Sequence, residues 1–91
     1  MKAKKVSPVF ETNDYSSFKK IKGNRGIDPQ HVNRLEHSFK KKHLKTPILL
    51  NEKMEIVDGQ HRVEAAKNLN LPVYYIIKEN YGLDEARALN S

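Results

Sequence analysis

The side chains best suited to chemistry in this chain form one run, Asp58, Gly59, Gln60, His61 and Arg62. A short β-branched run precedes them, and apolar residues at three- and four-residue spacing follow, so the pattern predicts a strand, a tight turn and a helix. An arginine in the first turn opposes the usual preference for acidic side chains at a helix N-terminus. A phosphate bound there would satisfy both the free backbone N–H groups and the guanidinium.

Under this anion-binding interpretation, each residue of the turn has a role. Gly59 would let a ligand approach the backbone closely because it has no Cβ. The Arg62 guanidinium would donate two hydrogen bonds to the phosphate, while Gln60 and His61 would orient it. Asp58 would cap the helix, or face a ligand hydroxyl or a metal ion. The interpretation requires accessible amides after Gly59, and it fails if a carboxylate of the chain holds Arg62 while those amides are closed off.

A structural interpretation of the same turn stays open, because short motifs have a high false-positive rate. Strand-to-helix turns often contain Asp and Gly without binding anything. Arg62 would then pair with Glu79 or Asp84 from a neighbouring element. Gln60 and His61 would be ordinary exposed residues of the first turn.

The pattern continues after the turn at Ala65, Ala66, Leu69, Leu71, Pro72 and Val73. Together with the turn, it resembles the central motif of the superfamily formed by ParB N-terminal domains and sulfiredoxins. The turn reads Gly-Glu-Arg-Arg in ParB proteins and Gly-Cys-His-Arg in sulfiredoxins, so Gly59 and Arg62 match both and His61 matches the second. The similarity covers about residues 22–78, including Asn24 and Arg25, which resemble the first ParB box, and residues 46–50, which resemble the preceding strand.

This resemblance implies a nucleotide-binding turn, because ParB proteins bind CTP and sulfiredoxins bind ATP, with the motif arginine on phosphate. It implies CTP or ATP with Mg²⁺ as the ligand, and as binding residues Gly59, Gln60, His61, Arg62, Arg25 and Asn24. The chain departs from sulfiredoxins at Gln60, where they carry a catalytic cysteine. Because the sequence contains no cysteine, thiol chemistry is excluded for this polypeptide. A further ParB box that contacts triphosphate and metal would fall at about Asn90.

Length and composition predict a single small domain over residues 1–91 with a modest core. We expect residues 1–5 to be a basic tail, and residues 82–91 to begin a helix leading to a further C-terminal part. There is no long apolar run, so neither a membrane span nor a signal peptide is predicted. The absence of cysteine is compatible with the cytoplasm, where we expect the protein. Pairing of two copies stays open.

The net charge of +6 is concentrated in the N-terminal half. Residues 1–45 contain twelve basic and four acidic side chains, whereas residues 46–91 contain five and seven. Lysine clusters could follow the phosphate backbone of DNA, although a solvated lysine surface is the alternative because arginine forks phosphate better. The clusters are Lys2, Lys4 and Lys5, then Lys19, Lys20 and Lys22, and then Lys40, Lys41 and Lys42.

Asp28 and Pro29 predict the start of a helix that runs to about residue 42. Its apolar stripe is Val32, Leu35 and Phe39. The candidate nucleic-acid-binding residues, on or beside the opposite face, are Arg34, His37, Lys40 and Lys41. We predict no metal site, because His31, His37 and His43 are spread around the helix.

Strands are predicted at residues 6–10, on a sheet edge, at 45–51 and 54–57, paired as a hairpin, and at 73–77, fully buried or central. Residues 11–17 are predicted to form a polar turn. Leu83, Ala86 and Leu89 predict a final amphipathic helix. The predicted fold class is α+β, with a small mixed sheet packed against helices that start at Asp28 and Gln60.

These features predict a ParB-like nucleotide- or phosphate-binding module in a DNA-associated protein of the plasmid, phage or chromosome-partition type. Any hydrolysis of a nucleoside triphosphate would rest on positioning and electrostatics around the phosphate. One alternative is a ParB-like nuclease in which His61 or Asp58 is catalytic. Another is an adaptor that binds DNA or protein and has no ligand of its own.

Overall fold

The computed structural model describes residues 8–43 and 45–89, so the predicted basic tail and the position near Asn90 lie outside the described residues. In chain order the elements are β1 (Phe10–Thr12), a short 3₁₀ helix (Tyr15–Ser17), β2 (Lys19–Lys20), α1 (Pro29–Lys41), β3 (Ile48–Leu50), β4 (Glu55–Asp58), α2 (Gln60–Asn68), β5 (Val73–Ile77) and α3 (Leu83–Leu89). No helix in this part of the chain is long and apolar enough to cross a membrane.

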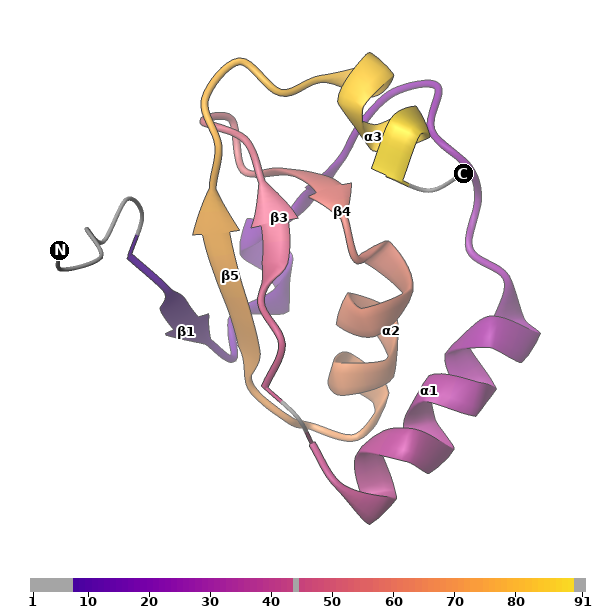
Figure 1. Ribbon diagram of the computed structural model, residues 1–91. Coiled ribbons are helices and arrows are strands. Elements are labelled where there is room, and N and C mark those ends of the chain that lie inside the picture. The colour runs from indigo at the N-terminus through magenta and orange to yellow at the C-terminus, as the bar shows by residue number, and fades with distance from the viewer. Residues whose placement is uncertain (1–7, 44, 90–91) are drawn as a thin grey trace, which may run out of the picture.

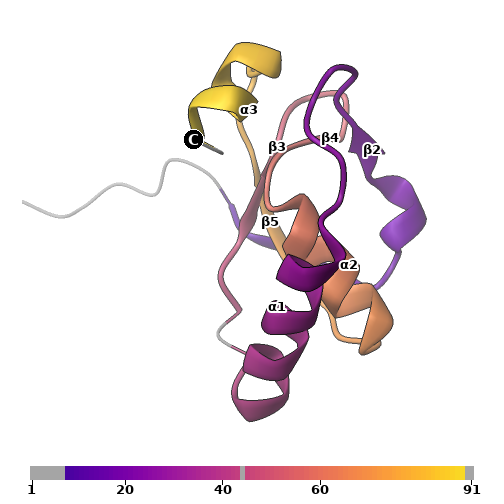
Figure 2. The ribbon, with the colours of Figure 1, turned by 90° about the vertical axis from the view of Figure 1, so that its right-hand side faces the viewer.

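The strands form one mixed sheet in the order β1-β5-β3-β4-β2. β3 lies at its centre, antiparallel to β4 and parallel to β5, while β1 and β2 form the two edges. α2 lies between the sheet and α1, and α3 packs near β4 at one end of the molecule (Figures 1 and 2). This arrangement confirms the predicted α+β fold class.

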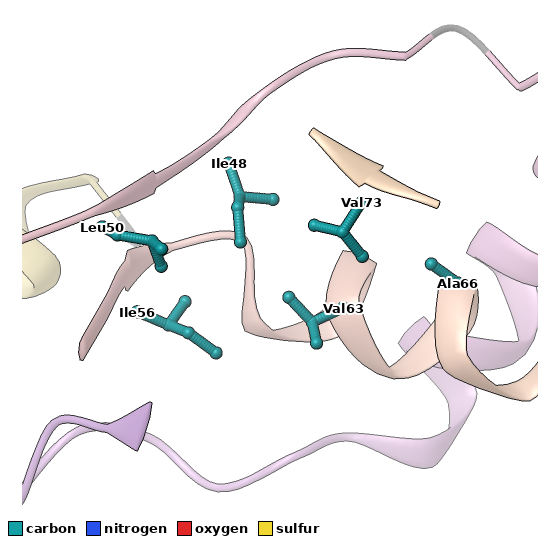
Figure 3. Packing of buried hydrophobic residues seen from close by; sticks show 6 residues of the cluster. All are labelled: Ile48, Leu50, Ile56, Val63, Ala66 and Val73. Atoms are coloured by element: carbon teal, nitrogen blue, oxygen red, sulfur yellow. The ribbon is translucent and has the colours of Figure 1, made fainter. Parts of the chain in front are cut away.

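The main core lies between the sheet and α2 (Figure 3). Its buried side chains are Ile48, Leu50, Ile56, Val63, Ala66 and Val73. Burying each of the larger aliphatic side chains contributes roughly 1.5–3 kcal/mol. A smaller cluster of Ile21, Val57 and Ala86 connects β4 to α3. The core therefore fixes β4 and α2, and with them the turn that joins the two.

The predicted start of α1 is confirmed. The Asp28 Oδ1 atom accepts a hydrogen bond of 3.0 Å from the Gln30 N–H, and Pro29 is the first helical residue. Val32 is buried and Leu35 and Phe39 are half-buried, so the apolar stripe faces inward as expected.

The predicted hairpin is also confirmed, and a buried polar side chain organises its turn. Asn51 is only 2% exposed. Its Oδ1 atom accepts hydrogen bonds from the Lys53 and Glu55 N–H groups, each at 3.0 Å. Its Nδ2 atom donates to the Glu55 carboxylate and to the Tyr81 carbonyl, each at 2.8 Å. Asn51 thus joins the hairpin to the segment that precedes α3.

Several predicted strand boundaries are wrong. β1 includes residues 11 and 12, predicted as a turn, because Phe10–Thr12 pair with β5. β3 is shorter than residues 45–51, since Lys45 has a left-handed backbone with φ of 61°. β5 lies between β1 and β3 in the sheet, as expected of a central strand, but it is not fully buried, since within it only Val73 is buried. In α3 the predicted stripe loses its last member, because Leu89 is 49% exposed.

Candidate functional site

The turn between β4 and α2 is built around Gly59, whose φ of 109° lies in the left-handed region. Gly59 is the N-cap of α2, so the prediction that Asp58 caps the helix is wrong. A Cβ on Gly59 would lie 2.5 Å from the Ile48 Cγ2 atom and 2.8 Å from the Ile48 Cβ atom. The missing side chain therefore makes room for Ile48, and the prediction that it makes room for a ligand is also wrong.

Arg62 contacts its own chain at three points. Its Nη2 atom lies 3.5 Å from the Asp58 Oδ2 atom, and its Nη1 atom donates to the carbonyls of Thr46 and Pro47 at 3.3 and 3.4 Å. The predicted alternative partners, Glu79 and Asp84, are wrong, because the carboxylate comes from the same turn. These distances are long for hydrogen bonds, and the contacts use at most three of the five guanidinium N–H groups.

Gln60 faces into the protein. It is 7% exposed, and its Nε2 atom donates a hydrogen bond of 2.9 Å to the Arg25 carbonyl. The prediction of an exposed residue is wrong, and the side-chain N–H group that would orient an anion is directed to the loop before α1. Gln60 joins the start of α2 to residues 24–28.

His61 makes a second connection to the same loop. Its Nε2 atom accepts a hydrogen bond of 3.0 Å from the Asp28 N–H, and its ring lies 4.3 Å from the His31 ring, centroid to centroid. Burial lowers the pKa of His61 below its usual 6.5, and the nearby His31 and Arg25 lower it further, against the opposing effect of Asp28. The imidazole is therefore neutral at neutral pH.

The first turn of α2 is partly accessible to solvent despite these contacts, because Gly59, His61 and Arg62 are half-buried whereas Gln60 is buried. It borders a cleft of about 160 Å³, which also reaches α1. The residues that line this polar cleft are His31, Leu35, Asp58, Gly59, Gln60, His61 and Arg62. The sequence interpretation excludes anion binding only if a carboxylate holds Arg62 and the turn after Gly59 is closed off. The first part of this condition is met by Asp58, but the second is not, because the turn borders the polar cleft.

A second, mainly apolar cleft of about 190 Å³ adjoins the first, since Arg62 and Leu35 border both. It lies between α1, α2 and the start of β5. Side chains on its wall include Phe39, His43, Thr46, Ile48, Ala66, Val73 and Tyr74. The His43 ring lies between the rings of Phe39 and Tyr74, with centroid distances of 5.0 and 6.0 Å.

The structure brings the two predicted motifs together. Arg25 is exposed, and its N–H donates to the Asn24 Oδ1 atom at 2.9 Å. Its carbonyl is held by Gln60, and its charge is close enough to influence His61. Residues 24–28 therefore lie beside the first turn of α2, although direct ligand contact by Asn24 or Arg25 stays a prediction.

The four predicted nucleic-acid-binding residues on α1 are all exposed, namely Arg34, His37, Lys40 and Lys41. Their role stays a prediction. Across residues 8–43 and 45–89, no group of three or more histidine, aspartate or glutamate side chains is placed to hold a metal ion. Asp58 and His61 share the polar cleft, but each is engaged with a partner within the chain.

Sequence reasoning missed His31, His43 and Tyr74 as cleft residues. The spacing of the histidines bears only on a possible ligand set within the predicted helix. The packing of α1 against α2 brings His31 to His61, and no spacing along the sequence signals that contact. Tyr75 packs against the main core, whereas Tyr74, the residue before it in β5, lines the apolar cleft.

The order of strands and helices defines this chain as a domain with the fold of ParB N-terminal domains. The solved structure that shows this is the C222₁ form of the Pnob8-like ParB-N domain, to which the chain is similar with a TM-score of 0.66 and 16% sequence identity. The match covers 90% of this chain and 32% of that one, so the chain spans about a third of its length. A scan against protein-family models and a search of curated proteins find no match.

Proposed function

We propose that this chain is a nucleotide-binding module of a DNA-associated protein, with the ligand phosphates at the N-terminus of α2. The observation that carries the proposal is the open polar cleft at that N-terminus, bordered by Arg62, in a domain with the ParB N-terminal fold. A helix N-terminus presents free backbone N–H groups and a partial positive charge, both of which favour an anion.

The contacts of Arg62 are compatible with an exchange of partners. Its side chain is 25% exposed, and that of Asp58 is 36% exposed. Ion pairs as exposed as this one contribute only about 0–1 kcal/mol, so releasing Asp58 costs little. A phosphate that accepts two hydrogen bonds from the guanidinium would offset that loss, because charge-assisted bidentate contacts are the stronger ones.

The apolar cleft next to Arg62 favours a nucleotide over a simple inorganic anion. Its walls of aromatic and aliphatic side chains are suited to a flat ring, as in most small-molecule sites. A ligand with phosphates in the polar cleft could place its base in the apolar cleft, beside Leu35 and the rings of Phe39, His43 and Tyr74. CTP and ATP are the candidates, and Arg62 would lie where their two parts meet.

Magnesium fits this site only as a companion of the ligand. The one carboxylate in the polar cleft belongs to Asp58, which is paired with Arg62. Mg²⁺ usually keeps several waters and binds through one or two carboxylates together with substrate phosphates. We therefore propose that Mg²⁺ arrives with the triphosphate and that the described residues build no separate metal site.

Contact with DNA is proposed for the outer face of α1. The side chains of Arg34, His37, Lys40 and Lys41 are exposed there, opposite the stripe that packs inward. Lysine and arginine contacts to phosphates make DNA binding depend steeply on salt. Replacing Lys40 and Lys41 with alanine should weaken binding of a DNA duplex in a fluorescence anisotropy titration and flatten its salt dependence. An unchanged salt slope would contradict this assignment.

Equilibrium dialysis with labelled CTP and ATP, each with and without Mg²⁺, tests the proposal. We expect the wild-type chain to retain one of the two, and Arg62→Ala to bind at least about tenfold more weakly, since hydrogen bonds to charged groups contribute roughly 1.5–3 kcal/mol. Arg34→Ala, which removes the same charge from the exposed face of α1, should bind like wild type. A circular dichroism spectrum identical to wild type would show that Arg62→Ala is folded.

The intramolecular contacts of Arg62 favour one alternative, an adaptor in which this arginine only joins the segment before β3 to α2. In that case no nucleotide is retained under any condition, and Arg62→Ala only lowers the stability of the fold. This result would overturn the nucleotide-binding proposal.

A further inference from the structure

Two successive residues of the motif hold the loop that precedes α1. Gln60 donates to the Arg25 carbonyl, and His61 accepts from the Asp28 N–H. These contacts span 35 and 33 residues of sequence, so they join two distant segments at one place. The two hydrogen bonds fix both ends of residues 25–28, and this segment places Arg25 beside the polar cleft.

The His61 contact depends on the protonation state of its ring. A backbone N–H can only donate, so the Nε2 atom must accept and the proton of the neutral ring is on Nδ1. When the imidazole gains a second proton, both ring nitrogens become donors and the hydrogen bond to Asp28 is lost. The Gln60 contact has no such dependence, because an amide does not titrate in this range.

We propose that Gln60 and His61 are positioning residues that clamp residues 25–28 to the start of α2, holding Arg25 beside the anion site, and that protonation of His61 releases the Asp28 end of the clamp. The part that concerns Arg25 rests on the proposed function. The clamp itself is a property of the free chain. It gives Gln60 and His61 a role other than ligand contact.

The groups around His61 shift its protonation, and with it the loss of the hydrogen bond to Asp28, to acidic pH. The His31 ring lies against the His61 ring at a tilt of 31°, Arg25 is nearby in the loop, and both disfavour a positive charge on His61. Asp28 opposes them, while Asp58 and Arg62 line the same cleft as a mutually neutralising pair. Burial has the largest effect and acts in the same direction as His31 and Arg25, so the pKa of His61 lies below its usual 6.5 and the Asp28 contact is intact at neutral pH.

The first test needs no ligand. Nuclear magnetic resonance would follow the Asp28 amide proton and the His61 ring of the full chain from pH 8 to pH 5. We expect the amide resonance to shift upfield with the same midpoint as the ring. His61→Gln, which keeps an acceptor but does not titrate, should remove that inflection, while the matched variant His31→Gln should keep it. The clamp would be overturned if the Asp28 amide resonance did not follow the titration of His61, or if it still shifted with pH in His61→Gln.

The second test asks whether Gln60 acts through Arg25. The labelled nucleotide that wild type retains, CTP or ATP, is titrated against wild type, Gln60→Met, Arg25→Ala and the double variant. Loss of the hydrogen bond from Gln60 to the Arg25 carbonyl should weaken nucleotide binding about fivefold in the wild-type background, the factor that corresponds to one typical hydrogen bond. The same loss should have no effect in the Arg25→Ala background. Equal weakening in both backgrounds would show that Gln60 contacts the ligand directly and would overturn this part.

The two tests separate the inference from the proposed function. If wild type binds no nucleotide, the proposed function and the Arg25 role fail together. The pH titration of the Asp28 amide still decides whether the clamp exists. Circular dichroism of Gln60→Met shows whether that variant is folded. Gln60→Glu keeps the length of the side chain but loses its N–H donor at neutral pH, so it provides a second measure of the hydrogen bond to the Arg25 carbonyl.

Discussion

Replacing Gly59 with alanine tests the account of the turn that places the site. The backbone there has φ of 109°, and an added Cβ would lie 2.5 and 2.8 Å from two carbon atoms of Ile48. Ile48 is 2% exposed and belongs to the main core, so it has little room to move. The substitution therefore combines a strained backbone with overpacking of the core.

The magnitude follows from these two effects. A left-handed backbone costs a residue with a Cβ roughly 1–2 kcal/mol. Extra methyl groups forced into a packed core cost typically about 1–3 kcal/mol. Together they predict that Gly59→Ala lowers the free energy of unfolding by about 2–5 kcal/mol. Since small domains have a total stability of roughly 5–15 kcal/mol, the loss should be large and easily measured.

Urea unfolding followed by far-ultraviolet circular dichroism measures this loss by linear extrapolation. The matched control is Gly26→Ala, because nothing lies within 4 Å of the Cβ that it would add. We expect that control to change the free energy of unfolding by less than about 0.5 kcal/mol. If Gly59→Ala were no more destabilising than Gly26→Ala, the reasoning that Ile48 requires this glycine would be refuted.

Three further predictions concern the elements around the site. Asn51→Ala should lower the free energy of unfolding by about 2–4 kcal/mol in urea, because it leaves buried hydrogen-bonding groups without their partner, whereas the exposed Asn13→Ala should have almost no effect. Asp28→Ala should cost about 0.5–2 kcal/mol through loss of the cap of α1, and Asp28→Asn should keep most of that stability; equal losses in thermal unfolding would contradict the capping role. The pKa of Glu52, measured by carbon-13 resonance, should lie below its usual value of 4.5, because the Asn80 backbone N–H donates to its carboxylate, and an ordinary value would disprove that contact.

The parts of this fold that sequence predicted depend on short-range chemistry. Asp28 and Pro29 start a helix because a cap and a fixed φ act within one turn. The hairpin and the strand-turn-helix around Gly59 are local in the same sense. The resemblance to ParB N-terminal domains added the overall fold, which the solved neighbour shows.

The parts that sequence did not predict depend on contacts between distant segments. Gln60 is buried because a carbonyl 35 residues away accepts from it, and no local pattern reports such a partner. The contact between the His31 and His61 rings likewise requires the packing of α1 on α2. Arg62 pairs with Asp58, four residues before it, and not with Glu79 or Asp84 from a neighbouring element. Only the assembled fold shows which of these groups face the clefts.

A titration of the nitrogen-15-labelled chain with CTP and with ATP, followed by amide resonance shifts, tests the central claim most directly. Binding of phosphate at the start of α2 predicts the largest shifts at the amides of Gln60, His61 and Arg62, with smaller ones along the apolar cleft at Tyr74. Resonances of Arg34 and Lys41 on the outer face of α1 should hardly move. If the amides of residues 60–62 stay fixed while the lysine-rich surface alone responds, the start of α2 is not a phosphate site.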